Sequence, residues 1–406
     1  MDPSQKPLKV AFYTFGCKVN LFESDQLKTS LYGIETVSCD DDADIFVINS
    51  CAVTATAESQ ARNMVRRLSK RGRVILTGCY ARKIKGEISF ENTEIVPDIS
   101  EVAEILGSHL KYDAFFTRSR PFIKIQSGCD QFCAYCIIPY LRGPLKSVPL
   151  HEIRALMQKI ADENFKEVVL TGIHIGKYGK DLNDGSTLAD VVKAGYETVR
   201  RVRMGSLESP EIDERLFEYA KEGMILPHWH IPLQSGCDKT LRDMRRPYKT
   251  DDFKRSIEKV VSSCKEFPAF GTDVITGFPG ETDEDFAATA KFIESLPFAY
   301  GHVFPFSARP GTPAEKMEKE NPVQKQVKKE RAAILRDIFQ AKKEAFQKSL
   351  SGTVEEVIIE EKIDENLFES TSSKYQTVHV RGSFKPRELV KVRLSFEKGR
   401  LSGSKS

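Results

Sequence analysis

The stretch Ser127-Gly-Cys-Asp-Gln-Phe-Cys-Ala-Tyr-Cys136 directly follows a short apolar run, residues 122–126, that has the length of a β-strand. Its cysteines, Cys129, Cys133 and Cys136, have the spacing C-x3-C-x2-C. A loop this short can wrap three thiolates around one corner of a [4Fe–4S] cluster, for which thiolates are the normal ligands. Three ligands for four irons leave one iron open to a small chelating molecule.

Structural zinc is the alternative for such a loop. A structural zinc site normally needs four ligands, often supplied by two C-x2-C pairs. The chain has nine cysteines, but no second pair and no following C-x2-4-H partner. The spacing therefore favours an iron–sulfur cluster.

The 406 residues are predicted to form three domains, at 8–115, 116–345 and 346–406. In the first, apolar runs at 10–15, 45–49 and 74–77 each precede a helical pattern, of which 52–70 is the clearest. This alternation indicates a small parallel α/β sheet.

The second and third domains differ in pattern. Six further strand candidates with intervening helices predict a partial (β/α)6 barrel, where chemistry collects at the C-terminal ends of the strands. A long amphipathic helix at 323–349 precedes strand candidates at 354–360, 376–380 and 389–394, which predict a small all-β barrel. The six candidates are residues 122–126, 167–170, 202–205, 230–233, 271–275 and 302–306.

Three other cysteines share one structural context. Cys17, Cys51 and Cys79 each follow one of the three strands predicted in the first domain. Parallel neighbouring strands end side by side, so these thiols are expected to converge and to hold a second [4Fe–4S] cluster with one open iron. The alternative is three small residues that are merely buried at loop starts.

The C-x3-C-x2-C motif is the signature of radical S-adenosylmethionine (SAM) enzymes. The resemblance implies that the open iron chelates SAM and that a 5′-deoxyadenosyl radical is released. It places Tyr135 near the adenine of SAM. It also implies SAM contacts at the ends of the later strands, at Gly172, Ser206, Glu208, Gln234 and Asp273.

With the second cysteine set, essentially the whole chain resembles the methylthiotransferases, whose C-terminal barrel is the TRAM domain that grips RNA. In that family the auxiliary cluster carries the inserted sulfur. One SAM methylates this sulfur, and a second SAM supplies the radical that activates the substrate carbon. The resemblance implies two [4Fe–4S] clusters, SAM and an electron donor such as flavodoxin or ferredoxin.

The family has three branches that modify different substrates, and each is a candidate for this chain. The stretch Gly16-Cys17-Lys18-Val19-Asn20 most resembles the branch that modifies N6-threonylcarbamoyladenosine at tRNA position 37. Residues 304–313 fit either tRNA branch and argue against the branch that modifies ribosomal protein S12. The isopentenyladenosine and S12 branches remain alternatives.

The expected macromolecular partner is a tRNA anticodon stem-loop. From Lys374 to the end there are nine Lys/Arg and two Asp/Glu, which suits a phosphate-binding surface. After residues 139–144 the sequence departs from the family, and the basic contact there is reduced to Arg142 and Lys146.

Two broader alternatives stay open. One is a radical SAM enzyme with a different outcome whose N-terminal cysteines are only structural, and the other is a non-catalytic iron–sulfur protein that binds RNA or senses redox state. No apolar run approaches the roughly 20 residues of a membrane span, and residues 1–7 do not resemble a signal peptide. We expect a cytoplasmic monomer without membrane contact. His228 and His230 are expected to be packed or hydrogen-bonded rather than ligands.

Overall fold

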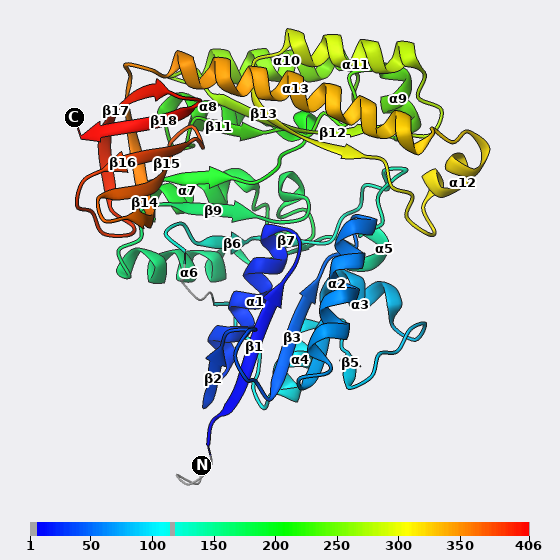
Figure 1. Cartoon of the computed structure of the whole chain (residues 1–406). Helices are drawn as coiled ribbons and strands as arrows, with labels where there is room; N and C mark the ends of the chain where they lie inside the picture. The colour runs from blue at the N-terminus through cyan, green and yellow to red at the C-terminus, as the bar shows by residue number, and fades with distance from the viewer. Residues whose placement is uncertain (1–5, 114–117, 406) are drawn as a thin grey trace. The chain divides into compact units, whose positions relative to one another are not determined.

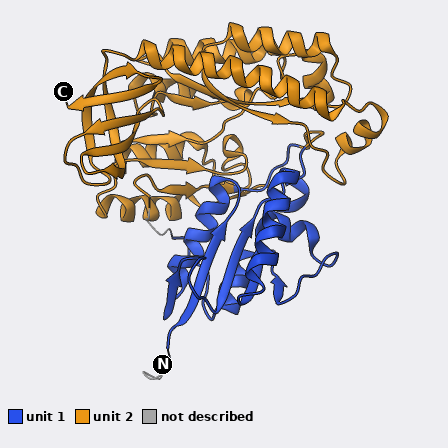
Figure 2. Cartoon of the chain, viewed as in Figure 1, with its two compact units in different colours: residues 1–116, 127–131, 136–144 blue, residues 117–126, 132–135, 145–406 orange. Residues whose placement is uncertain are grey.

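The computed structural model describes residues 6–113 and 118–405, and the chain forms two compact units (Figures 1 and 2). Unit 1 comprises Met1–Phe116, Ser127–Gln131 and Cys136–Pro144, and unit 2 comprises Thr117–Gln126, Phe132–Tyr135 and Leu145–Ser406. The predicted domain boundary between residues 115 and 116 lies outside the described residues. In the described ranges, no helix has both the length and the apolar character of a membrane span.

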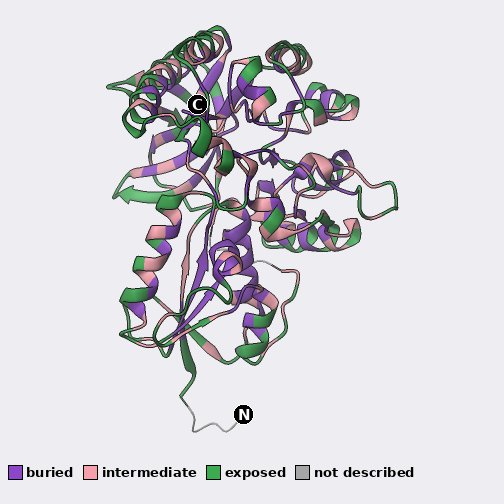
Figure 3. Ribbon diagram, turned by 90° about the vertical axis from the view of Figure 1, so that its right-hand side faces the viewer, coloured by how far each residue is buried: buried purple, intermediate pink, exposed green. Residues whose placement is uncertain are grey.

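Unit 1 is built on a five-stranded parallel sheet with the order β2-β1-β3-β4-β5. Helices cover both faces of this sheet, so every residue of the central strand β3 is buried (Figure 3). The predicted parallel α/β sheet is confirmed. The strands are β1 (Leu8–Thr14), β2 (Ile34–Val37), β3 (Ile45–Ser50), β4 (Arg73–Thr77) and β5 (Thr93–Ile95), and the main helices are α1 (Lys18–Ser30), α2 (Ala55–Leu68), α3 (Gly78–Ile84) and α4 (Ile99–Ile105).

Unit 2 contains the predicted partial (β/α)6 barrel. Its strands form two parallel three-stranded sheets, β10-β9-β6 and β11-β12-β13, joined by isolated bridges such as Ser206 to His230. The strands β6 and β13 are the two edges, so the barrel is open, as predicted. The bounds are β6 (Phe122–Lys124), β9 (Val168–Thr171), β10 (Val202–Met204), β11 (His228–His230), β12 (Ala269–Thr276) and β13 (Phe298–Pro305).

Three of these strands begin earlier than predicted, β11 at His228, β12 at Ala269 and β13 at Phe298. The fourth, β11, ends at His230, because Pro232 offers no N–H and Gln234 has a left-handed φ of 64°. The sixth, β13, begins at Phe298 and pairs with β12 across a bulge between Phe270 and Gly271. The main helices of this barrel are α6 (Leu150–Asp162), α7 (Leu188–Thr198), α8 (Glu214–Glu222), α10 (Thr250–Ser263) and α11 (Asp283–Ser295).

The long helix α13 (Lys325–Ser349) leads into a closed all-β barrel with the order β14-β15-β16-β18-β17, which confirms the predicted C-terminal architecture. Phe346 and Leu350, at the end of this helix, join the apolar core of the barrel together with Ala269 and Ala299 from the preceding strands. The C-terminal barrel and the partial barrel therefore share one core. Its strands are β14 (Val354–Asp364), β15 (Leu367–Ser372), β16 (Thr377–Arg381), β17 (Leu389–Glu397) and β18 (Arg400–Lys405).

A buried charge cluster fastens the two barrels of unit 2 together. Glu167 is fully buried, and its carboxylate accepts hydrogen bonds from Arg203 at 2.8 Å and Arg201 at 3.1 Å, with Arg120 at 3.7 Å. Arg203 also donates to the carbonyls of Ser372 and Ser373 in the C-terminal barrel. Burial alone would raise the pKa of Glu167, but the three guanidinium charges lower it.

Replacing Glu167 by Ala is expected to destabilise unit 2 by about 3–5 kcal/mol, because three buried guanidinium groups lose their common counter-charge. Denaturant unfolding followed by the fluorescence of the buried Trp229 measures this change. The control is Glu197→Ala, which removes a half-exposed partner of Arg154 and should cost only about 0–1 kcal/mol. Equal midpoints for the two variants would contradict the structural role of Glu167.

Candidate functional site

The structure brings Cys17, Cys51 and Cys79 to one edge of the sheet of unit 1. Cys17 follows β1 and caps α1, Cys51 follows β3, and Cys79 is the second residue of α3 after β4. These three strands are parallel neighbours, so their ends lie side by side. Cys51 and Cys79 are buried and Cys17 is exposed. A set of three soft sulfur donors fits an iron–sulfur cluster.

Electrostatics support this proximity. Burial raises the pKa of the Cys51 thiol to about 11, and the thiolates of Cys79 and Cys17 add to the increase. A neighbouring like charge has this effect only at short range. The three sulfurs therefore form one group, whose thiolate state needs a positive partner.

Two glycines keep this edge open. A Cβ on Gly16 would lie 2.8 Å from the Cβ of Cys51, and a Cβ on Gly78 would lie 2.3 Å from Oδ1 of Asn49. Both glycines have positive φ, 105° and 87°. Only glycine allows the chain to turn this sharply beside the cysteines.

Arg142 supplies positive charge at this edge, and it is also part of unit 1. Its Nε donates to Sγ of Cys79 at 3.2 Å, while its terminal nitrogens donate to Glu23 at 2.8 and 3.1 Å and to Asn20 at 2.9 Å. Burial raises the pKa of the Cys79 thiol, and Arg142 lowers it. The side chain of Arg142 is only 4% exposed, so the basic contact expected at this position is made inside unit 1, with Glu23 and Cys79.

The residues of the C-x3-C-x2-C loop are divided between the two units. Cys129 and Cys136 belong to unit 1 and Cys133 belongs to unit 2. Gly128 is required at the start of the loop, since its φ is 73° and a Cβ would lie 1.8 Å from the carbonyl oxygen of Pro144. The amide of Cys129 donates to the carbonyl of Gly143 at 3.1 Å, which closes the loop base in unit 1.

In unit 2, Arg246 links three residues that the sequence resemblance placed near SAM or the cluster. Its guanidinium donates to Sγ of Cys133 at 3.2 Å and to the hydroxyl of Tyr135 at 3.4 Å, and it forms an ion pair with Glu208. Tyr248 holds the guanidinium from the other side at 3.0 Å. Arg246 is 8% exposed, so this is a buried polar group next to the cluster loop.

The remaining predicted cofactor residues divide into two sets. Gly172, Ser206 and Gln234 follow the ends of β9, β10 and β11, as expected for a pocket at the strand termini. A Cβ on Gly172 would lie 3.0 Å from the carbonyl oxygen of Gln126, so the backbone alone is presented there. Asp273 lies inside β12 instead.

Asp273 is held between two histidines. Its Oδ2 contacts Nε2 of His230 at 3.0 Å, and its Oδ1 contacts Nδ1 of His302 at 3.0 Å. The hydroxyl of Tyr300 contacts Nδ1 of His230 at 3.0 Å and Nε2 of His228 at 2.8 Å. Both predicted histidines are thus hydrogen-bonded, as expected. The two histidines lower the pKa of Asp273 against the effect of burial.

Two family models match separate regions of the chain. The family model described as the radical SAM superfamily matches residues 123–293, and the one described as uncharacterized protein family UPF0004 matches residues 9–97. A threonylcarbamoyladenosine tRNA methylthiotransferase, MtaB, from Aquifex aeolicus is 34% identical over 91% of this chain and 98% of its own length. The MtaB of Bacillus subtilis is also 34% identical, over 92% of this chain and 90% of its own.

The chain belongs to the radical SAM methylthiotransferase family. Its fold also resembles solved radical SAM enzymes. The methyltransferase TsrM from Kitasatospora setae, solved with cobalamin and a [4Fe–4S] cluster, superposes with a TM-score of 0.54 at 10% identity, over 76% of this chain and 77% of that chain. At this identity the similarity supports the fold alone. Family membership implies SAM and a [4Fe–4S] cluster.

Sequence reasoning missed Arg246 and named Arg142 only as a basic contact, not as a partner of a cysteine. Arg142 and Arg246 each reach a cysteine sulfur, yet neither lies at a strand end or within a cysteine motif. The only signal for Arg142 was its place between Gly143 and the cluster loop. Nothing in the sequence distinguishes Arg246 from its neighbours Arg242 and Arg245.

Gly78→Ala should disturb the cysteine edge of the methylthiotransferase, because the new Cβ meets Asn49 at 2.3 Å. The matched control is Gly86→Ala, which has a similar φ of 81° but no atom within 4 Å. Both substitutions should carry a backbone cost of about 1–2 kcal/mol, and only Gly78→Ala adds the clash. We expect faster alkylation of the buried Cys79 in metal-free Gly78→Ala protein, measured by peptide mass spectrometry. Equal alkylation rates in both variants would contradict this reading.

Proposed function

We propose that this methylthiotransferase converts N6-threonylcarbamoyladenosine at position 37 of tRNA to its 2-methylthio derivative, using two [4Fe–4S] clusters. One observation carries the proposal. Three cysteines end three neighbouring parallel strands of unit 1, in addition to the C-x3-C-x2-C loop. A radical SAM enzyme that used a single cluster would have no need for this second set.

Each cysteine set receives its own role. The spacing of Cys129, Cys133 and Cys136 assigns them to the cluster that binds SAM, and Cys17, Cys51 and Cys79 are assigned to the auxiliary cluster. When bound, these groups supply the radical and the sulfur that the methylthio transfer requires. An external one-electron donor, of the flavodoxin or ferredoxin class, and a monomeric chain complete the proposal.

The protein's own arginines support the two sites. Arg142 offers an N–H to Sγ of Cys79, and Arg246 offers one to Sγ of Cys133. A hydrogen bond to a cluster sulfur stabilises its negative charge and tunes its potential. Arg246 also orients Tyr135 and Glu208, two of the proposed SAM contacts.

The substrate assignment rests on the relatives and on the basic C-terminal surface. The Aquifex and Bacillus relatives are named for threonylcarbamoyladenosine in tRNA and align over nearly their whole length. Lys391, Arg393, Lys398 and Arg400 are exposed on the C-terminal barrel, where they suit RNA phosphates. Lys374 does not contribute, because it is buried between Glu355 at 2.6 Å and Glu266 at 3.1 Å.

A second candidate substrate is the dimethylallyl (isopentenyl) form of the same adenosine. A tRNA-2-methylthio-N(6)-dimethylallyladenosine synthase from Fervidobacterium nodosum is 31% identical over 89% of this chain and 90% of its own length. This identity is only slightly lower than that of the MtaB relatives. The two candidates differ in charge, since a threonylcarbamoyl group carries a carboxylate and a dimethylallyl group is apolar.

Substitutions in the two cysteine sets should cause different losses of activity. Cys133→Ala should abolish the formation of 5′-deoxyadenosine from SAM and reductant, whereas Cys51→Ala should retain it but yield no methylthiolated product. The control is Cys39→Ala, which removes a cysteine outside both sets. Chromatography of the nucleosides and iron analysis measure these outcomes, with about eight irons expected in the control and about four in each variant. Methylthiolated product from Cys51→Ala would remove the auxiliary cluster from the reaction.

Nucleoside mass spectrometry of tRNA from a strain that lacks the gene tests the substrate. We expect 2-methylthio-N6-threonylcarbamoyladenosine to disappear and its unmethylthiolated precursor to accumulate. The gene supplied on a plasmid should restore the product, and the Cys51→Ala gene should not. Loss of the methylthiolated isopentenyl nucleoside instead would overturn the assignment.

A further inference from the structure

A cavity of about 430 Å³ lies beside the edge strand β13 of unit 2, within the roughly 300–1,000 Å³ typical of small-ligand sites. Its walls come from three places: β13, the helix α13, and the turn that leads into β16. We refer to it as the β13-edge pocket. Its lining residues are Tyr300, Gly301, His302, Arg336, Phe339, Gln340, Lys343, Gln347, Tyr375, Gln376 and Thr377.

Residues from both faces of the edge strand β13 line the pocket. Gly301 faces α13, because a Cβ there would lie 2.3 Å from the ring of Phe339. Side chains alternate along a strand, so Tyr300 and His302 point to the opposite face, where His302 contacts Asp273. Since β13 pairs only with β12, nothing in its own sheet covers this edge.

The helix side of the pocket is positively charged. Arg336, Gln340, Lys343 and Gln347 recur at intervals of four, three and four residues, which places them on one stripe of α13. Arg336 and Lys343 are exposed and form no ion pair with any described residue. Arg336 donates one hydrogen bond, to the carbonyl of Val303 at 3.3 Å, and keeps its other donors.

No carboxylate lines the pocket among the described residues. Two acidic groups on the elements that line or adjoin the pocket are already engaged. Glu344 accepts a hydrogen bond from Gln340 at 2.9 Å, and Asp273 is shared by His230 and His302. The pocket therefore combines two cations with neutral hydrogen-bonding groups, which is the composition of an anion site.

His302 adds an oriented polar atom on the strand side. Its Nδ1 faces Asp273 at 3.0 Å, so its Nε2 points away from that carboxylate. The side chain is 57% exposed despite this contact. His302 lies three residues before the end of β13 at Pro305, about 10 Å below the strand termini. A long substituent on a base bound at the termini would reach this depth.

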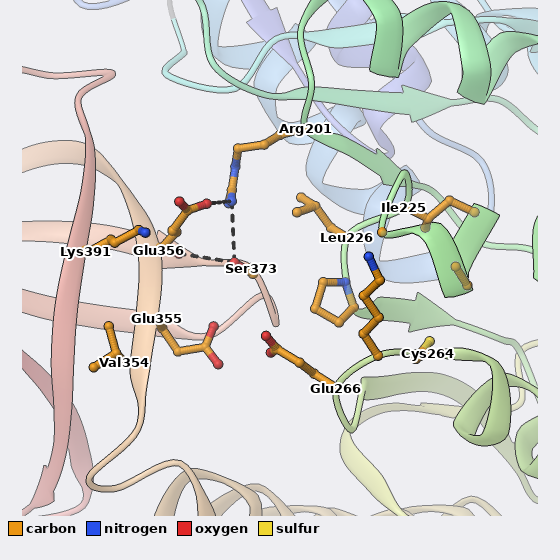
Figure 4. Close-up of a pocket in the computed structure, with 14 residues that line it drawn as sticks. Arg201, Ile225, Leu226, Cys264, Glu266, Val354, Glu355, Glu356, Ser373 and Lys391 are labelled. Carbon is orange, nitrogen blue, oxygen red and sulfur yellow. Dashed lines mark hydrogen bonds and ion pairs between the residues drawn. The ribbon is translucent and has the colours of Figure 1, made fainter. Parts of the chain in front are cut away.

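A second cavity of unit 2, shown in Figure 4, differs from the β13-edge pocket in the charges of its lining residues. It measures about 380 Å³ and is lined by Glu266, Glu355 and Glu356 together with Arg201 and Lys391. Its three carboxylates are paired, since Arg201 pairs with Glu356 at 3.0 Å and Lys374, which lies outside the lining, pairs with the other two acids. Three carboxylates on its wall disfavour an anionic ligand.

We propose that the β13-edge pocket binds the carboxylate of the threonylcarbamoyl group through Arg336 and Lys343, with His302 as a third polar contact. This inference rests on the proposed function and makes these residues determinants of substrate specificity. Gln340, Gln347 and Thr377 match the hydroxyl and urea groups of the same substituent. A backbone phosphate of the tRNA has similar anionic oxygens, so the test separates the two sources.

The test compares two anticodon stem-loop RNAs that differ only at position 37, one with N6-threonylcarbamoyladenosine and one with adenosine. The full chain with its clusters is titrated with each RNA, as wild type and as the double variant Arg336→Gln and Lys343→Gln. Both side chains are exposed, so the variant should fold. Lys329→Gln, an exposed cation of α13 outside the pocket, controls for general loss of charge.

The double variant should lose about tenfold to hundredfold in affinity for the threonylcarbamoyl RNA. Its affinity for the adenosine RNA should change no more than that of Lys329→Gln. Equal loss for both RNAs, with a salt slope lower by about one for each cation removed, would assign the cations to phosphate and overturn the proposal. Unchanged affinity for both RNAs would overturn it as well.

Failure of the proposed function is recognised separately. In that case the wild-type enzyme itself shows no preference for the threonylcarbamoyl RNA, and the substrate assignment falls together with this inference. A wild type that prefers the threonylcarbamoyl RNA, with a double variant that keeps the same preference, overturns only the role of the β13-edge pocket.

Discussion

Parallel strand pairing is the constraint on which the rest of this structure depends. Parallel neighbouring strands have their C-terminal ends at the same edge of a sheet. Both units place residues of the candidate sites at such an edge. In unit 1 it gathers Cys17, Cys51 and Cys79. In unit 2 it gathers the residues that follow β9, β10 and β11. Residues far apart in the sequence become neighbours because the backbone hydrogen bonds of the sheet leave no other arrangement.

This constraint explains how much of the fold and site could be predicted from the sequence. The strands β3 and β4 are largely buried, and they appear with β1 as short apolar runs, so these three strands and the convergence of three cysteines could be foreseen. In the same way, the family resemblance predicted that cofactor contacts gather at the strand ends of the partial barrel in unit 2. The C-terminal barrel was predicted from three of its strands, and in β16 and the first part of β17 buried residues alternate with less buried ones.

The parts that sequence reasoning missed are those fixed by distant partners. The strand β15 has the sequence Leu-Phe-Glu-Ser-Thr-Ser, and its inward Ser370 is buried because its hydroxyl donates to the carbonyl of Val378 on β16. A buried serine hydroxyl needs a hydrogen-bond partner, and here the neighbouring strand supplies it. The role of Arg142 and the whole contribution of Arg246 were missed for the same reason. The carboxylate and the sulfur that each arginine contacts come from parts of the chain that only the fold brings near it. The resemblance placed Asp273 at the end of the fifth strand, whereas the structure continues β12 to Thr276 and sets Asp273 within it, between His230 and His302.

The shared core and the Glu167 cluster of unit 2 also bear on how this protein evolves. Phe346 and Leu350 lie in the core of the C-terminal barrel, and Arg203 reaches from β10 to the carbonyls of Ser372 and Ser373. The C-terminal barrel is thus not an independent module that recombination could exchange intact, because its removal would expose an apolar core and leave a buried charge without its partners. A barrel joined in this way is inherited together with the partial barrel whose core it completes.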